Sequence, residues 1–467
     1  MFPDARKERY ILTLDIGTSS IKGAILSTMG KLVSLARKSF TDSGLNGYGS
    51  FSAHAWSGAL AEVMAGLWIP DDLLAVCVSG NGPTLVPLSK EGVPLYSVLL
   101  WVDERNNRIS NLPSFYLPKA AWLSEHEPEV YEKTAVFLGC PEYINYLLTG
   151  EFATILPHSG FQQYIWDKSQ ISSYGLDDDR FPEFVHMGSV VGRVAAKAGE
   201  RYGVPKGVPV YAGGPDFFMA LLGTAAVEPG RVCDRAGTSE GVNLCIDSDY
   251  KVDGLRTLPH VIQGFYNLAA IEPFSGRFFE WFRGISGQEG KDYERMFKEI
   301  SEKELSSKPR FFPSIGKKGL WDFSGGIFSG LSVEHSTADM GRAVVEAIGY
   351  CVKSGIKKMG DSGFPFTQLR ASGGQAKNPI WNQMKADITG QEILVPEICD
   401  SELTGCLCCA LYGEGYDSSV KEASERVVRF PKTYQPDRTR FEQYEESYHR
   451  YQQTYSAIIR AVSQQNT

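Results

Sequence analysis

Long apolar runs are missing from this chain: no stretch of its 467 residues reaches the roughly 18 apolar residues that a membrane-spanning helix needs. Long basic runs are missing too, and the formal net charge of -8 argues against nucleic acid or an anionic membrane surface as the main partner. The first residues, MFPDARKERY, lead into the apolar ILTLDIG without a basic segment and an apolar leader core. We therefore expect a soluble, cytoplasmic protein that binds a small molecule, with no nucleic-acid and no membrane partner.

Cysteine and histidine do not occur in metal-binding patterns. The nine cysteines are an odd number, and most stand among apolar or small residues, as in GCLCCAL around Cys406, Cys408 and Cys409. No second Cys or His pair lies at ligand spacing from that cluster, and the seven histidines form no HExxH. Reduced core thiols are the better interpretation, and a metal site at residues 406–409 is the weaker one.

The commonest phosphate-binding motifs are also absent, since the chain has neither GxxxxGK[ST] nor a GxGxxG after a strand. It does contain a Gly-Thr-Ser turn twice, in YILTLDIGTSSIKGAIL at residues 10–26 and in RVCDRAGTSEGVNLCI at residues 231–246. Each turn joins two apolar, β-branched runs, which predicts a β-hairpin whose turn can bind phosphate through backbone N–H groups. The recurrence indicates an internally duplicated chain.

Length and repeat together predict two domains, because 467 residues exceed what one hydrophobic core usually supports. The second hairpin begins just after the Pro-Gly punctuation of VEPG at 227–230, so we expect domains at 1–230 and 231–467. Strands alternate with helices through both halves, which indicates an α/β protein with mixed sheets. Periodic apolar residues predict a helix from Asp339 to Met359, capped by Ser336, and an aromatic stripe from Phe441 to Val462 predicts a last, docking helix.

Two aspartates are candidates for phosphoryl-transfer chemistry. Asp15 stands two residues before Gly17, where its carboxylate can orient a hydrated Mg²⁺, and Lys22 can reach the same anion. A tight hairpin with a capping aspartate is the alternative. Asp216 follows the apolar strand VYAGGP, so it would emerge at a strand end facing the cleft between the halves and accept the proton of an attacking hydroxyl. On position alone, a strand-end turn carboxylate explains Asp216 equally well.

The segment LLWVDER at 99–105 has the mixture of side chains that sugar sites need. Trp101 can pack on the apolar face of a polyol, Asp103 can accept hydroxyl hydrogen bonds, and Arg105 can pair with an acid to fix the cluster. A salt-bridged strand end is the alternative interpretation.

The tract ASGGQAKN at 371–378 follows an apparent strand and precedes an expected helix from Pro379 through Ile388. Without side chains at Gly373 and Gly374 a flat ring can approach the backbone, and Asn378 can hydrogen-bond it. An ordinary Gly-Gly turn is the alternative.

Taken together, these motifs resemble the FGGY family of carbohydrate kinases over nearly the whole chain. The similar segments are DIGTSSIKGA at 15 (first phosphate loop), LWVDER at 100 (W-x-D-x-R), KAAWLSEHEP at 119 (K-x-x-W-L), EYINYLLTGEFAT at 142 (L-T-G-E), AGGPDFFMALLGTAAVEPG at 212 (catalytic aspartate), GTSEGV at 237 (second phosphate loop) and SGGQAKNPIWNQMKADITG at 372 (adenosine-binding segment). Most specific is GIFSGL at 326–331, followed after seven residues by DMGRAVVE at 339–346, which fits the family's C-terminal signature.

The resemblance implies two RNase H-like domains of the actin, hexokinase and Hsp70 type, with an interdomain catalytic cleft. It implies a kinase that uses ATP and Mg²⁺ to phosphorylate a small sugar or polyol, a ketopentose being favoured. Asp216 would be the general base, and Asp15 with Asp216 would organise Mg²⁺, partly through water. The residues implied to contact the nucleotide are Gly17, Thr18, Ser19, Lys22, Gly237, Thr238, Ser239, Gly373, Gly374 and Asn378. Those implied on the sugar side are Asn81, Trp101, Asp103, Asp216 and Phe217.

The chain departs from the family mainly around the acceptor. Xylulokinase-like members carry Gln-Met-His-Gly where this chain reads Asn81-Gly-Pro-Thr84, and the Arg-Glu pair of glycerol kinases is absent too. Pro215 replaces a more usual glycine before Asp216. A catalytically silent sugar- or nucleotide-binding regulatory homologue is therefore the alternative function, while the W-x-D-x-R cluster disfavours an ATPase that acts on proteins. Dimers are common among the kinases that the chain resembles, so a homodimer is one expected state.

Overall fold

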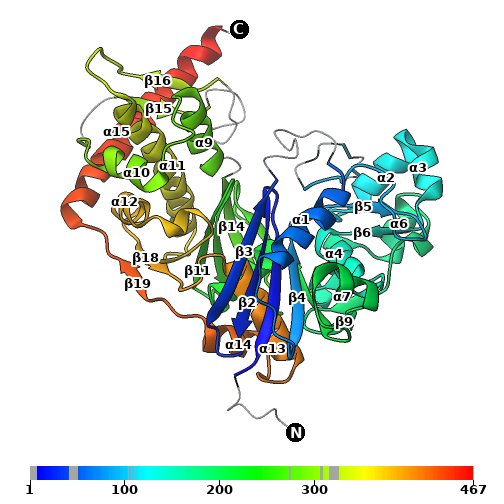
Figure 1. Ribbon diagram of the computed structural model, residues 1–467. Coiled ribbons are helices and arrows are strands. Elements are labelled where there is room, and N and C mark those ends of the chain that lie inside the picture. The colour runs from blue at the N-terminus through cyan, green and yellow to red at the C-terminus, as the bar shows by residue number, and fades with distance from the viewer. Residues whose placement is uncertain are drawn as a thin grey trace. The chain divides into compact units, whose positions relative to one another are not determined.

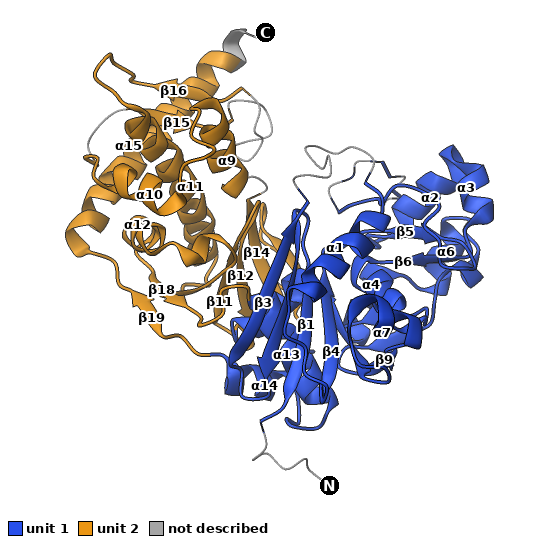
Figure 2. Ribbon diagram, in the orientation of Figure 1, with its two compact units in different colours: residues 1–225, 261–263, 401–428 blue, residues 226–260, 264–400, 429–467 orange. Residues whose placement is uncertain are grey.

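The computed structural model describes residues 8–40, 51–101, 103, 105, 106, 108, 109, 111–272, 275–305, 309–314 and 325–465. The chain divides into two compact units, each with its own sheet (Figure 2). Unit 1 comprises Met1–Ala225, Val261–Gln263 and Ser401–Val428, and unit 2 comprises Ala226–His260, Gly264–Asp400 and Arg429–Thr467.

Unit 1 is built on a six-stranded mixed sheet with the strand order β3-β2-β1-β4-β10-β9. Its strands are β1 (Tyr10–Ile16), β2 (Ser20–Ser27), β3 (Leu32–Ser39), β4 (Ala75–Gly80), β9 (Val190–Arg193) and β10 (Pro209–Pro215). The expected first hairpin is confirmed, since β1 and β2 pair antiparallel from Tyr10 opposite Ser27 to Ile16 opposite Ile21. Strands β1, β4 and β10 run parallel, so their carboxyl ends lie at one edge of the sheet.

Helices and short strand pairs surround this sheet (Figure 1). The helices of unit 1 are α1 (His54–Ala65), α2 (Leu117–His126), α3 (Pro128–Lys133), α4 (Cys140–Thr149), α5 (Gln162–Ile165), α6 (Lys168–Ser173), α7 (Ala196–Tyr202), α8 (Asp216–Gly223), α13 (Ser401–Gly413) and α14 (Val420–Val427). The short pairs join β5 (Val86–Leu88) to β6 (Val136–Leu138) and β7 (Thr154–Leu156) to β8 (Phe184–His186). The alternate, buried positions of β1, β2 and β4 pack with α1 and α4 in one apolar core.

Unit 2 repeats this arrangement in a seven-stranded sheet with the order β13-β14-β12-β11-β17-β18-β19. Its strands are β11 (Val232–Ala236), β12 (Glu240–Ile246), β13 (Arg256–Pro259), β14 (Tyr266–Glu272), β17 (Gln368–Ser372), β18 (Glu392–Val395) and β19 (Lys432–Tyr434). Strands β11, β12, β14, β17 and β18 have the order and directions of β1, β2, β3, β4 and β10. The duplication expected from the two turns is therefore a duplication of the sheet, and the expected RNase H-like fold class is confirmed.

The helices of unit 2 confirm the local signals read from the sequence. They are α9 (Ser275–Ile285), α10 (Tyr293–Ser301), α11 (Thr337–Asp361), α12 (Pro379–Thr389) and α15 (Arg438–Gln465), beside the short pair β15 (Arg310–Phe312) and β16 (Ile327–Ser329). A capping box of Ser336 and Asp339 begins α11. In α15 the aromatic stripe docks as expected, because Tyr444, Tyr448 and Tyr451 are buried among residues of α11, α12 and β15.

The units differ from the expected domains 1–230 and 231–467 in three places, of which two are small: residues 226–230 belong to unit 2, and residues 261–263 belong to unit 1. Residues 401–428, with α13 and α14, belong to unit 1 although they follow most of unit 2 in the chain. Helix α13 packs on β1, β4 and β10 and against α8, and the approach to α8 is close: a Cβ on Gly405 would lie 2.1 Å from the carbonyl oxygen of Met219. The chain therefore crosses between its two units more than once.

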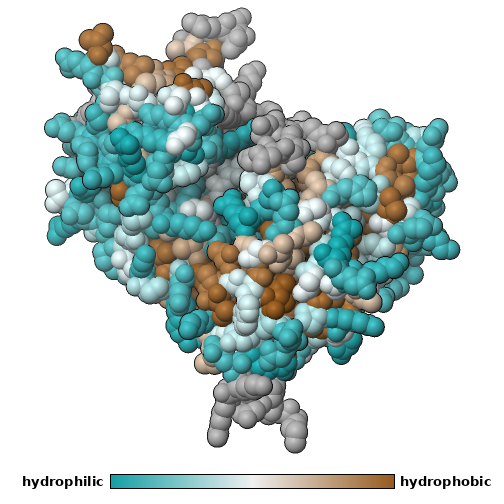
Figure 3. Space-filling model, viewed as in Figure 1, coloured by the Kyte–Doolittle hydropathy of each residue, from teal (hydrophilic) through white to brown (hydrophobic). Residues whose placement is uncertain are grey.

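The edge strand β3 carries exposed apolar side chains. Leu32, Val33 and Leu35 of the edge strand β3 are exposed, and apolar side chains gather over the region of β3 in Figure 3.

All nine cysteines are free thiols, and every one except the half-buried Cys399 is buried. No helix among the described residues is both long and apolar enough to cross a membrane.

Candidate active site

The first Gly-Thr-Ser turn closes the hairpin of β1 and β2. The Gly17 N–H donates to the carbonyl oxygen of Ser20 at 2.9 Å, and a Cβ on Gly17 would meet nothing closer than that same oxygen at 3.4 Å. Asp15 and Lys22 are directly paired in the hairpin register, with 3.5 Å between the Asp15 Oδ2 and the Lys22 Nζ. The turn thus has open space beside it, with a buried carboxylate and an ammonium group at its base.

Asp216 lies at the same sheet edge as Asp15. The register aligns Asp15 with Ser79 on β4 and Ser79 with Gly214 on β10, so Asp216 follows two residues beyond that level. Because one strand separates β1 from β10, aligned residues on the two strands lie about 10 Å apart. Asp216 begins α8 and is 8% exposed. A carboxylate in the first turn of a helix is stabilised as an anion by the helix dipole.

Cys140, the first residue of α4, has a buried thiol that is not a nucleophile. Its thiol is fully buried, and burial, then the charges of Glu142, Asp216 and Asp15, raise its pKa well above the ordinary value. A thiol held protonated in this way does not react. The joint influence of Asp15 and Asp216 on one thiol agrees with their placement at a common edge.

The aromatic and acidic cluster of the 99–105 segment reaches the first turn. The Trp101 Nε1 donates to the Thr18 Oγ1 at 3.0 Å, and Trp101 as a whole residue is 38% exposed. Arg105 donates two hydrogen bonds to the Asp103 carboxylate, from Nε to Oδ1 at 3.0 Å and from Nη2 to Oδ2 at 2.6 Å. Although burial opposes it, these bonds lower the pKa of Asp103, which stays ionised. The expected pairing of Arg105 with an acid is present, and Glu104 lies outside the described residues.

Lys119 is a buried cation that sequence reasoning did not single out as a site residue. Its Nζ donates to the Pro83 carbonyl oxygen at 2.5 Å. Burial lowers its pKa to about 8, against the opposing charge of Asp103. The sequence did contain a signal for this residue, since Lys119 is the first residue of the K-x-x-W-L segment. In the structure, Lys119 links helix α2 to the loop that follows β4.

The side chain of Asn81 is buried, whereas the simplest form of the predicted sugar contact needs a side chain that is exposed. It is 1% exposed, its Nδ2 donates to the Ile16 carbonyl oxygen at 3.1 Å, and its Oδ1 accepts from the Thr84 hydroxyl at 2.5 Å. Its backbone N–H also donates to Ile16, at 2.8 Å. In this arrangement Asn81 fixes the ends of β1 and β4 to each other.

Phe217 belongs to an aromatic group that the sequence analysis overlooked. Its ring centroid lies 4.1 Å from that of Phe218 and 6.4 Å from that of Phe161, which in turn contacts Tyr164 at 5.3 Å. Tyr116 lies near the same edge, with its hydroxyl oxygen 3.5 Å from the position that a Cβ on Gly82 would take. The density of aromatic residues in FQQYIW at 161–166 was the available signal.

In unit 2 the second turn also closes a hairpin, but its hydrogen bond spans one residue fewer, since the Gly237 N–H donates to the Ser239 carbonyl oxygen at 2.8 Å. Gly373 has a φ of +90°, and a Cβ on it would lie 2.4 Å from the Ala236 carbonyl oxygen, so a close approach to β11 requires glycine there. Gly374, by contrast, would admit a Cβ with no atom within 4 Å, as the predicted approach of a ring requires.

Asn378 proves to be the N-cap of α12. Its Oδ1 accepts from the backbone N–H groups of Ile380 and Trp381, both at 3.0 Å. The side-chain oxygen is therefore engaged within the helix, and the predicted hydrogen bond to a nucleoside falls to the amide nitrogen.

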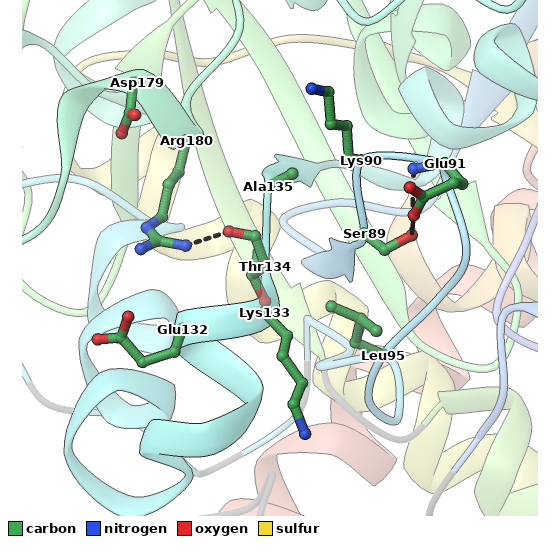
Figure 4. A pocket seen from close by; sticks show the side chains of 10 residues that line it. All are labelled: Ser89, Lys90, Glu91, Leu95, Glu132, Lys133, Thr134, Ala135, Asp179 and Arg180. Atoms are coloured by element: carbon green, nitrogen blue, oxygen red, sulfur yellow. Dashed lines mark hydrogen bonds between the residues drawn. The ribbon is translucent and has the colours of Figure 1, made fainter.

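A hollow of about 590 Å³ lies elsewhere in unit 1, between the β5–β6 pair and the segment around Arg180 (Figure 4). Its lining includes Lys90, Lys133 and Arg180 together with Glu91, Glu132 and Asp179, so its charges balance. Arg180 is already held by the Thr134 carbonyl oxygen, and Ser89 by Glu91. None of the predicted site residues lines this hollow, and we assign it no ligand.

The donor set at the first turn fits a hydrated Mg²⁺ rather than a softer metal. Asp15 offers hard carboxylate oxygens beside the open space at Gly17, and Mg²⁺ binds through few carboxylates, keeping water and phosphate oxygens as its other ligands. Across the described ranges no group of three or more His, Cys, Asp or Glu side chains could enclose a metal ion. A cation held mainly by a nucleotide is consistent with both observations.

Comparison with known proteins completes the description of the site. Residues 10–223 match the model of the N-terminal domain of the FGGY family of carbohydrate kinases, and residues 235–414 match that of its C-terminal domain. A xylulose kinase of Lactococcus lactis is 26% identical over 484 residues, covering 96% of each chain. An autoinducer-2 kinase of Escherichia coli is 24% identical over 510 residues, covering 97% of this chain and 96% of that protein.

Solved structures show the same fold. The crystal structure of xylulose kinase from Rhodospirillum rubrum aligns with a TM-score of 0.77 at 22% identity, over 96% of this chain and 99% of that one. Gluconate kinase from Lactobacillus acidophilus aligns with a TM-score of 0.78 at 18% identity, over 97% and 99%. With both family models matched in order along the chain, this protein belongs to the FGGY family of carbohydrate kinases and is a sugar kinase.

Proposed function

We propose that this kinase transfers the terminal phosphoryl group of ATP to a hydroxyl of a small ketose or polyol, with a ketopentose of the xylulose or ribulose type favoured. The observation that carries the proposal is the position of Asp216. It begins α8 at the sheet edge that also bears Asp15, in a unit where Trp101 is hydrogen-bonded to Thr18 of the first turn. The proposal thereby assigns binding of the acceptor and binding of phosphate to residues on neighbouring elements of unit 1.

In this proposal Asp216 accepts the proton of the attacking hydroxyl, and its place in the first turn of α8 favours the carboxylate through the helix dipole. Lys22 and the backbone N–H groups of the first turn bind phosphate oxygens, and Asp15 holds the hydration shell of the metal. ATP with its Mg²⁺ supplies the phosphoryl group and neutralises charge on it. In unit 2 the turn Gly237-Thr238-Ser239 and the segment 373–378 bind the rest of the nucleotide.

The acceptor would lie against Trp101 and Phe217, with Asp103 held ionised by Arg105 to accept hydrogen bonds from its hydroxyls. Relatives of comparable similarity are named for xylulose and for autoinducer-2, which supports a small, ketose-like acceptor without choosing between them. The His-bearing segment of xylulokinase-like members is absent, and Asn81 is engaged within the chain in its place. The acceptor pocket therefore differs from a xylulokinase-like one.

Purified protein with MgATP should release ADP when one member of a panel of pentuloses, hexuloses, aldoses and polyols is added. Asp216→Asn should lower kcat by a factor of roughly 10² to 10⁴, the contribution of a general base, without changing ADP affinity. Asp179→Asn, which alters an exposed carboxylate of the same unit, serves as the matched control. Sugar binding by calorimetry without ADP release from any acceptor would instead establish the silent regulatory homologue.

A further inference from the structure

The side chain of Gln375 connects the nucleoside segment of unit 2 to the second phosphate turn. Its Oε1 accepts from the Trp381 indole N–H at 2.8 Å, and its Nε2 donates to the Ser275 hydroxyl at 2.9 Å and to the Gly237 carbonyl oxygen at 3.4 Å. The indole nitrogen can only donate, so the amide oxygen must face Trp381 and the amide nitrogen must face the turn. Trp381, itself buried, thus fixes the orientation of the amide.

A buried ionic network continues from Ser275 beneath the turn. Because Ser275 accepts from Gln375, its single hydroxyl proton is free to go to the Glu240 Oε2, with which it is in hydrogen-bond contact. The Glu240 Oε1 and the Asp234 Oδ2 each lie 2.6 Å from the Lys385 Nζ. All four of these residues are essentially inaccessible to solvent, so a hydrogen-bonded route runs from α12 through α9 to β11 and β12.

The backbone around the turn leaves little freedom for movement. A Cβ on Gly276 would lie 2.1 Å from the Gly237 carbonyl oxygen, so α9 abuts the turn directly. The Arg277 N–H donates to the Thr238 carbonyl oxygen at 3.2 Å. Gln375 and α9 therefore hold the carbonyl oxygens of Gly237 and Thr238. The Gly237 N–H is bonded within the turn to the Ser239 carbonyl oxygen, so the N–H groups of Thr238 and Ser239 are the turn's candidates for binding an anion.

From these contacts, and resting on the proposed function, we propose that Gln375 is a positioning residue. It holds the turn Gly237-Thr238-Ser239 in register with the nucleoside segment, so that the turn's donors meet the terminal phosphates of the nucleotide. Gln375 acts through the turn and need not touch the nucleotide itself. Its loss should weaken binding of the terminal phosphates and spare binding of the nucleoside.

The test compares binding of ADP and AMP by isothermal titration calorimetry, using the full chain and the variants Gln375→Leu and Trp381→Phe. Gln375→Leu keeps the volume but removes the hydrogen bonds, and we expect a roughly tenfold rise in the Kd of ADP with less than a twofold change for AMP. Trp381→Phe keeps the amide but removes the group that orients it, so a smaller rise of a few-fold is expected. The KM of the acceptor at saturating ATP should not change in either variant.

An unchanged Kd of ADP in Gln375→Leu would overturn the positioning role, as would equal losses for ADP and AMP, which indicate general damage to the unit. Trp381→Phe keeps the test decisive if Gln375→Leu does not fold. Failure of the proposed function has a different signature, because the unaltered protein would then release no ADP from MgATP with any acceptor, whatever its affinity for ADP.

Discussion

Glu142 provides a quantitative test of the electrostatics in the core of unit 1. It lies in the first turn of α4 and is 7% exposed. Its Oε1 accepts from the Ile155 N–H at 3.2 Å, while its Oε2 has no hydrogen-bond partner among the described residues. Burial raises the pKa of Glu142 from 4.5 to about 7, against the opposing effect of backbone N–H groups.

The pH window and the magnitude follow from this change in pKa. Between about pH 4.5 and pH 7 the folded protein holds a proton that the unfolded chain has released, so the free energy of unfolding decreases as pH rises. Below that window both states are protonated and the penalty vanishes. At about 1.36 kcal/mol for each pKa unit, a rise from 4.5 to about 7 corresponds to about 3 kcal/mol at pH 8.

Glu142→Gln imitates the protonated carboxyl at every pH and keeps an acceptor for the Ile155 N–H. We expect the variant to match the unaltered protein near pH 4.5 and to exceed its free energy of unfolding by about 3 kcal/mol at pH 8. Urea denaturation followed by circular dichroism across this range measures the difference, with the exposed Glu129→Gln on α3 as control. A difference that does not grow with pH would refute the reasoning.

Three further predictions concern the turns, the acceptor side and the thiols. Gly373→Ala should destabilise the protein by more than about 1 kcal/mol, because φ is +90° and the added Cβ meets the Ala236 carbonyl; an unchanged melting temperature would contradict this. Trp101→Ala removes the ring against which the acceptor is proposed to lie and should raise the KM of the acceptor several-fold more than that of ATP, as steady-state kinetics would show. Native protein should react with a thiol reagent rapidly at Cys399 at most, whereas the denatured chain should titrate nine thiols.

Much of the fold was predictable because its signals are local. The two hairpins follow from β-branched runs on either side of a Gly-Thr-Ser turn, and the start of α11 follows from a Ser and an Asp three residues apart. These features depend on backbone conformations and hydrogen bonds within a few residues. Sequence alone therefore suffices for them.

The return of α13 to unit 1 was not predictable in this way. A helix that is apolar and small on nearly every side, such as SELTGCLCCALYG, must be buried, but nothing within it specifies which sheet it covers. The information lies in pairs of distant residues. A Cβ on Gly223 would lie 1.8 Å from the Ser401 carbonyl oxygen, and only the fold reveals that these two residues touch.

The site was predictable by residue type more than by role. The roles of Asp15, Asp216 and Trp101 stay predictions, although the structure places the two aspartates at one sheet edge and Trp101 against Thr18. Asn81 and Asn378 were chosen for hydrogen bonds that they also make within the chain, to Ile16 and to the start of α12. An amide that can both fix the backbone and bind a ligand has the same appearance in a sequence, so burial and partners must separate the two roles.

The duplicated turns are not equivalent, and their difference agrees with a division of labour. Two residues before the glycine, the first copy has Asp15 and the second has Arg235. The first position is acidic and pairs with Lys22, while the second is basic, and the acids near it, Asp234 and Glu240, are buried against Lys385. A carboxylate suits a metal-bearing phosphate, and a guanidinium suits a bare one. Under the proposed function, residues of opposite charge at this position would give two similar backbones different partners, which is a reason for one chain to keep both turns.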